Sequence, residues 1–180
     1  LFPWTDGEST TKTMAAIRNP MYILKDLFLG FSIVPTFFAA LFILTVFIGS
    51  GISSAFLPII YTNQLGWKPE IYSQVIGIPG TIIEFCSALF GGFVADKIGK
   101  RSVITIGYTA YAILTIIFGL LYNYWGYNII SITYLIIYPG CIAFGTVALF
   151  SLFMKISWTR AAATMFTSYM AMANLSTTIG

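Results

Sequence analysis

The spacing of charged side chains constrains this chain more than any other feature, because charge-free stretches are long enough to cross a lipid bilayer. Residues 27–67, 102–154 and 161–180 contain no charged residue, and residues 71–95 contain only Glu84. A bilayer core about 30 Å thick needs roughly 20 predominantly apolar residues in helical form. The charge pattern therefore predicts several transmembrane segments rather than a water-soluble core.

These stretches predict helices and not barrel strands, because the apolar runs are continuous instead of alternating with a period of two. The longest run is interrupted by an Asn-, Gly- and aromatic-rich turn at residues 122–128, a composition typical of the membrane surface. We therefore predict an all-α polytopic membrane protein with about five transmembrane helices. The expected spans lie near residues 36–60, 72–95, 103–122, 129–154 and 161–180.

Basic residues indicate how these spans are oriented. With alternating topology, eight of the nine Lys and Arg residues fall on one side of the membrane, and only Lys68 falls on the other. The positive-inside rule makes the more basic side cytoplasmic. The opposite side carries aromatic residues around 61–72 and 124–127, as in an interfacial aromatic belt. The basic residues on the predicted cytoplasmic side are Lys12, Arg18, Lys25, Lys97, Lys100, Arg101, Lys155 and Arg160.

Composition argues against several other functional classes. The chain is 58% hydrophobic and 8% charged, with a net charge of +3 and no His. The low charge argues against nucleic acid as a partner, and the lack of His argues against zinc-hydrolase motifs and Ser–His triads. The two cysteines, Cys86 and Cys141, are too few for a disulfide scaffold or a four-ligand metal site. We therefore expect no metal site, no cofactor and no enzymatic activity.

One charged loop carries a recognisable motif between the second and third predicted spans. It reads Gly-Phe-Val-Ala-Asp-Lys-Ile-Gly-Lys-Arg over residues 92–101. A glycine in the helix allows a neighbouring helix to approach, and a glycine in the loop permits a tight turn. The carboxylate can pair with a helix N-terminus or a cation, and the basic residues fix the topology. The residues that define this motif are Gly92, Asp96, Lys97, Gly99, Lys100 and Arg101.

This motif resembles the G-x-x-x-D-[RK]-x-G-[RK]-[RK] signature of the major facilitator superfamily. In that family the signature lies in the cytoplasmic loop between the second and third helices of each six-helix half, and acts as a gate latch. The resemblance implies a secondary active transporter that works by alternating access. It also implies that the other six-helix half is a partner of the helices in this chain.

The position of the polar N-terminal segment favours the C-terminal half of such a transporter. Residues 1–35 would be the cytoplasmic linker between the halves, and residues 36–180 would be helices 7 to 11, with the last one cut short. Because the chain starts at Leu1 and stops inside an apolar run, we expect a piece of a longer protein. An N-terminal half remains the alternative. Within the linker, the spacing of Leu24, Leu27, Phe28 and Phe31 indicates either a surface helix or the first turns of span one.

The last segment suggests a subfamily. Residues 158–176 resemble the eleventh-helix region of the AmpG-type muropeptide permeases and the related acetyl-CoA transporters. The resemblance implies a muropeptide or anhydro-sugar importer coupled to protons, in a bacterial inner membrane. The alternatives are a permease for another solute such as an acyl-CoA-type anion, or a membrane-embedded enzyme.

Glu84 is the candidate for proton coupling or substrate contact. It lies twelve residues before Asp96, which corresponds to about 18 Å along a helix and places it near the bilayer midplane. A charge at that depth costs at least about 2.5–3.5 kcal/mol, so we expect the side chain to face the bundle interior. A protonated Glu that bonds a neighbouring helix is the structural alternative. Further candidates for a polar cavity are Ser53, Ser54, Thr146 and Asn174, each of which could instead make a local helix–helix hydrogen bond.

Overall fold

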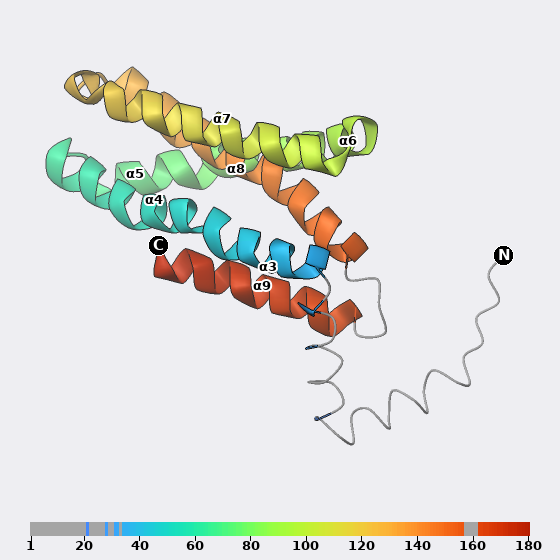
Figure 1. Cartoon of the computed structure of the whole chain (residues 1–180). Helices are drawn as coiled ribbons and strands as arrows, with labels where there is room; N and C mark the ends of the chain where they lie inside the picture. Colours follow the sequence, from blue (N-terminus) through green and yellow to red (C-terminus); the bar gives the residue numbers. More distant parts are fainter. Residues whose placement is uncertain (1–20, 22–27, 29–30, 33, 157–161) are drawn as a thin grey trace.

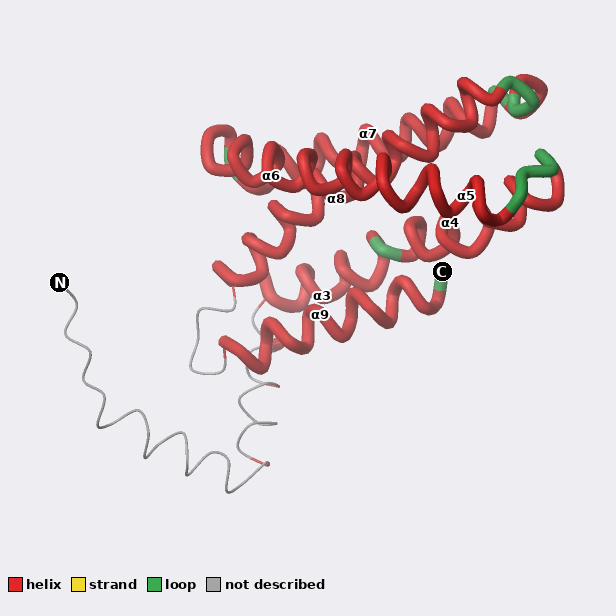
Figure 2. Tube along the Cα trace, turned by 180° about the vertical axis from the view of Figure 1, so that it is seen from behind, coloured by secondary structure: helices red, strands yellow, loops and turns green. Residues whose placement is uncertain are grey.

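The computed structural model describes residues 21, 28, 31–32, 34–156 and 162–180. Every regular element in these described residues is helical, and they contain no strand (Figure 2). The predicted linker and its amphipathic segment lie almost entirely outside the described residues, as do Lys12, Arg18, Lys25 and Arg160. The elements are α3 (Val34–Val46), α4 (Ile48–Ile59), η1 (Ile60–Gln64), α5 (Pro69–Val75), η2 (Ile76–Gly80), α6 (Thr81–Ile98), α7 (Lys100–Leu120), η3 (Tyr122–Tyr124), α8 (Asn128–Ile156) and α9 (Ala162–Ile179).

The helices confirm an all-α polytopic membrane fold. Among the described residues, four stretches are long and apolar enough to cross a membrane: Thr36–Gln64, Pro69–Ile98, Lys100–Leu120 and Asn128–Lys155. They correspond to the first four predicted spans. The fifth predicted segment forms α9, but α9 is not among these stretches because its seven Ser, Thr and Asn side chains reduce its hydropathy. A fifth span therefore stays a prediction.

Helix α8 packs between α6 and α7, and small residues make that packing close. Gly107 of α7 lies against Gly145 of α8, where a Cβ on Gly107 would be 2.7 Å from the Gly145 nitrogen. Gly91 of α6 lies against Phe144 in the same way, with 2.7 Å to the Phe144 carbonyl oxygen. These contacts bring helix backbones together as small residues do in membrane proteins generally. They hold α6, α7 and α8 in one group (Figure 1).

A second group consists of α3, α4 and α9, which lie side by side in Figure 1. The buried Ser176 hydroxyl of α9 donates a hydrogen bond to the Leu44 carbonyl at 2.9 Å. Tyr169 of α9 is fully buried and stacks on Phe153 of α8, with 4.8 Å between ring centroids. The Tyr169–Phe153 pair therefore ties the second group to the first.

Two spans contain π-helical segments near a proline. η1 follows Pro58, and η2 includes Pro79. Proline lacks the N–H that continues the α-helical ladder, so the backbone reorganises around it. The Thr62 hydroxyl donates to the Pro58 carbonyl at 2.7 Å and satisfies an oxygen in this region. η2 leads directly into the helix that carries Glu84.

Candidate functional site

The motif loop is a single-residue link between two antiparallel helices. α6 ends at Ile98, α7 begins at Lys100, and Gly99 between them has φ +94° and ψ 144°. L side chains are strained in this region of backbone space, whereas glycine adopts it readily. The structure thus gives Gly99 the turn-forming role that its spacing predicts.

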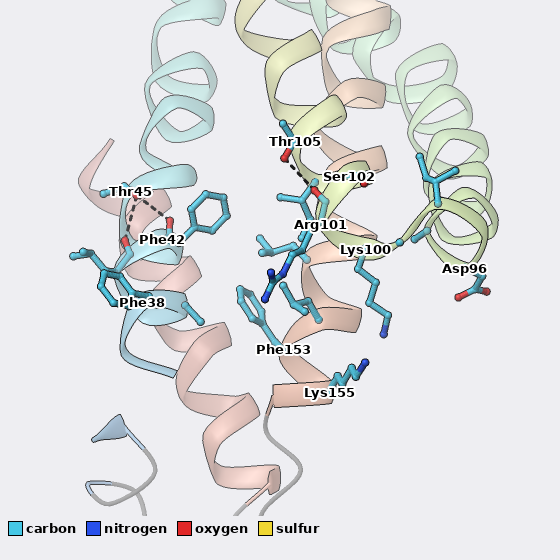
Figure 3. Close-up of a pocket in the computed structure, with 18 residues that line it drawn as sticks. Phe38, Phe42, Thr45, Asp96, Lys100, Arg101, Ser102, Thr105, Phe153 and Lys155 are labelled. Carbon is cyan, nitrogen blue, oxygen red and sulfur yellow. Dashed lines mark hydrogen bonds between the residues drawn. The ribbon is translucent and has the colours of Figure 1, made fainter. Parts of the chain in front are cut away.

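Four of the six motif residues border one large groove. Asp96, Gly99, Lys100 and Arg101 line a groove of about 1390 Å³ together with residues of α3 and α8 (Figure 3). Lys97 lies outside this lining, and its ammonium is 4.4 Å from the centroid of the Phe93 ring. Three of the four charged motif residues are therefore gathered at one place, between α3, α6, α7 and α8.

Gly92 has a different environment from the one expected. A Cβ on Gly92 would be 3.6 Å from Val147 Cγ1, which is an ordinary contact. The close backbone approach to α8 occurs one residue earlier, at the buried Gly91. Both glycines suit helix packing in a membrane, and the sequence alone does not distinguish which of two consecutive glycines faces the partner helix.

The basic motif residues are not paired with Asp96. Lys100 Nζ donates to the Ser151 carbonyl oxygen of α8 at 3.0 Å and so ties α7 to α8. Among the described residues, no basic group lies within 4.0 Å of the Asp96 carboxylate. Figure 3 shows the Arg101 side chain extending toward Phe153 and the Asp96 side chain on the far side of Lys100 from it. Of the two partners predicted for Asp96, a helix N-terminus or a cation, the cation is therefore absent from the part of the chain that the structure describes.

Glu84 lies in the first turn of α6, near the middle of the span Pro69–Ile98. Its side chain is exposed at the surface of the helices and borders two depressions. In the described residues it therefore does not face the enclosed bundle interior that the sequence predicts. The smaller depression, about 250 Å³, also has Ser54 and Tyr138 in its wall. The larger one, about 480 Å³, has Thr146 in its wall. Glu84 is thus brought close to two of the four predicted cavity residues.

The other two predicted cavity residues do not join Glu84. Ser53 lies within hydrogen-bond distance of Tyr111, with 2.7 Å between Ser53 Oγ and the phenol oxygen, so it contributes to the contact between α4 and α7. Asn174 is exposed on α9 and lines neither the depressions beside Glu84 nor the groove beside Arg101. Thr146 also serves packing, because its hydroxyl is 3.0 Å from that of Tyr108.

Two residues beside Glu84 were not predicted from the sequence. Thr81 precedes Glu84 by three positions, which places the two on one helix face, and it lines both depressions. Tyr138 comes from α8 and stacks on Tyr134, with 5.3 Å between ring centroids. The three-residue spacing from Glu84 could have predicted Thr81 from the sequence. The position of Tyr138 beside Glu84 depends instead on how α8 packs against α6.

Aromatic residues fill the core at the end of the bundle near the α4–α5 turn. Tyr61 is fully buried and donates to the Ser131 carbonyl at 2.8 Å. Phe118 stacks on Tyr134 at 3.9 Å and on Trp125 at 4.6 Å. Of the residues expected in an interfacial belt, Tyr61 is therefore buried and Trp67, Tyr72 and Trp125 are half-buried against it, while Tyr124 and Tyr127 remain exposed.

No protein-family model, curated protein or solved structure matches this chain. The resemblance to the major facilitator superfamily therefore depends on residues 92–101 and on the order of the spans. For metal binding, the described residues hold no cluster of three or more Cys, Asp or Glu side chains.

Proposed function

We propose that this chain belongs to a secondary active transporter of the major facilitator type, which moves a small solute by alternating access with proton coupling. The observation that carries the proposal is the position of Glu84 near the middle of a membrane span, beside a small depression with hydroxyl side chains in its wall. An ionisable residue at membrane depth is a functional-site hypothesis by default because of its insertion cost.

Hydroxyl side chains lie beside Glu84 in the wall of the smaller depression. Thr81, Ser54 and Tyr138 supply hydroxyl groups around the smaller depression. A hydroxyl can donate to a carboxylate or accept from a protonated carboxyl, so it can serve both states. In the proposed mechanism the Glu84 carboxyl group carries the coupled proton from one side of the membrane to the other.

The motif groove supports the gating part of the proposal. The Lys100–Ser151 hydrogen bond joins α7 to α8 at the same end as the Gly99 turn. Arg101 and Asp96 lie beside this junction without an ion pair between them. In the proposed transporter the free Asp96 carboxylate binds a cation of the partnering six-helix half in one state and separates from it in the other. This end of the bundle faces the cytoplasm in the proposed orientation.

The finer proposal concerns the solute and the cell membrane. The segment 158–176 favours a muropeptide or anhydro-sugar imported with protons across a bacterial inner membrane. A permease for an acyl-CoA-type anion is the alternative within the same mechanism.

The experiment measures uptake of a labelled anhydro-muropeptide by vesicles that contain the full-length protein, with and without an imposed proton gradient. We expect gradient-dependent uptake that Glu84→Gln reduces at least tenfold. Glu70→Gln is the matched control, because Glu70 is an exposed carboxylate at the start of α5, and it should leave uptake unchanged. Gradient-dependent uptake that survives Glu84→Gln would reject the coupling role. Uptake of acyl-CoA-type anions alone would replace the muropeptide proposal and keep the transporter.

A further inference from the structure

The groove beside the motif has two chemically different parts. Its wall is apolar, formed by Phe38, Leu41 and Phe42 of α3 and by Leu149 and Phe153 of α8. Phe38 is 62% exposed and Leu41 is 51% exposed, so the α3 wall is open to the surroundings of the chain. In a membrane-spanning helix such open apolar side chains contact lipid tails. The groove is therefore continuous with the lipid-facing surface.

The end of the groove is basic. Lys100, Arg101 and Lys155 line it, and Asp96 is the one acidic residue among its lining residues. Figure 3 shows the Arg101, Lys100 and Lys155 side chains at the lower part of the groove and Asp96 at its edge, on the far side of Lys100 from Arg101. Within the described part of the chain, neither Arg101 nor Lys155 forms an ion pair. Two unpaired cations beside an apolar wall favour a ligand with an anionic head and an apolar tail.

The size and position of the groove also favour a lipid. Its volume of about 1390 Å³ exceeds the roughly 300–1,000 Å³ typical of small-molecule pockets. The cations lie at helix ends: Lys100 and Arg101 begin α7, and Lys155 is in the last turn of α8. Helix ends of membrane spans lie at the headgroup level, where basic pockets between helices bind acidic lipid headgroups.

We propose that this groove, between α3, the α6–α7 turn and α8, binds an anionic phospholipid. The phosphate lies at Arg101 and Lys155, and an acyl chain lies along Phe38, Leu41 and Phe153. Lys100 already donates to the Ser151 carbonyl, so it adds to the positive potential of the groove without contacting the phosphate directly. A bound lipid of this kind fills the space between α3 and α8. The proposal depends on the membrane location of the helices and not on transport activity.

The test compares two lipids on the full-length protein purified in a neutral detergent. Dioleoyl-phosphatidylglycerol and dioleoyl-phosphatidylcholine are added separately, and retained lipid is measured by native mass spectrometry alongside the thermal unfolding midpoint. We expect retention of phosphatidylglycerol and a rise in the unfolding midpoint, with little effect of phosphatidylcholine. Arg101→Gln and Lys155→Gln should each weaken phosphatidylglycerol binding roughly fivefold, as expected for one basic residue near an acidic headgroup.

Lys68→Gln is the matched control, because Lys68 is an exposed cation that does not line the groove. Equal binding of both lipids, or an equal loss with Lys68→Gln, would overturn the proposal. Glycerophosphoglycerol, the water-soluble headgroup without acyl chains, separates a lipid site from a soluble-anion site. If it stabilises the protein as much as the lipid does, the groove binds a soluble anion and the lipid proposal is wrong. Should Arg101→Gln fail to fold, Lys155→Gln at an exposed helix end carries the test.

Discussion

Ser53 Oγ and the Tyr111 hydroxyl lie 2.7 Å apart and join α4 to α7. The same phenol donates to the Gly49 carbonyl at 3.0 Å. These hydrogen bonds connect the two groups of helices. The residues around Ser53 and Tyr111 in the sequence do not indicate this contact. It means that Ser53, predicted as a cavity residue, has a structural role in this conformation.

Replacing Tyr111 with Phe should lower the free energy of unfolding by about 1 kcal/mol, since interhelical hydrogen bonds in membranes contribute about that much. The loss is measured by unfolding in mild detergent. Ser53→Ala should cost less, because Tyr111 keeps its bond to Gly49. The double variant should cost less than the sum of the two single changes, and strict additivity would show that the two hydroxyls are not coupled.

Replacing Gly107 with Ala should destabilise the packing of α7 on α8 by about 1–3 kcal/mol, the usual cost of overpacking. The new methyl would meet the Gly145 backbone, which cannot move as a flexible side chain can. The unfolding midpoint is the measurement. Gly119→Ala on the same helix is the control, because nothing lies within 4 Å of a Cβ there, and it should be neutral or stabilising. Similar losses for both variants would contradict the observed contact.

Replacing Gly99 with Ala should destabilise the turn between α6 and α7 by about 1–3 kcal/mol, because of its backbone conformation. No atom lies within 4 Å of a Cβ at this position, so the cost would come from strain alone. Gly126→Ala provides a loop glycine with equally open space and without a positive φ. Thermal unfolding of the two variants should differ, and equal stability would argue that Gly99 is not strained by a side chain.

Replacing Lys100 with Gln should weaken the junction between α7 and α8 by about 1 kcal/mol, because a charge-assisted hydrogen bond to Ser151 is lost from a half-buried site. Lys97→Gln removes the same charge from an exposed position outside the groove and should have a smaller effect. Hydrogen exchange at the Lys100 end of α7 is the measurement. Faster exchange in both variants alike would point to a general charge effect instead.

The sequence predicted the first four spans because a charged side chain is costly inside the bilayer, so charged residues mark the ends of the spans. It also predicted the turn at Gly99, because a glycine between two spans can adopt the positive φ that a tight turn uses. The sequence could not distinguish Gly91 from Gly92, because that depends on the rotation of α6 against α8. For the same reason it missed Tyr138 beside Glu84, a neighbour that only the packing of α8 supplies.

The π-helical segment η2 changes the direction in which residues after it face, relative to residues before it in the same span. In an α-helix each residue advances about 100° around the axis, and a π-bulge accommodates an extra residue within the turn. Tyr72 and Val75 before η2 pack on the aromatic core, while Glu84 after it borders the depressions. Deleting one residue within η2 would turn the aromatic face by about 100° relative to Glu84. The bulge thus sets the angle between the part of the span that packs on the aromatic core and the part that carries Glu84, so that the two parts face different neighbours.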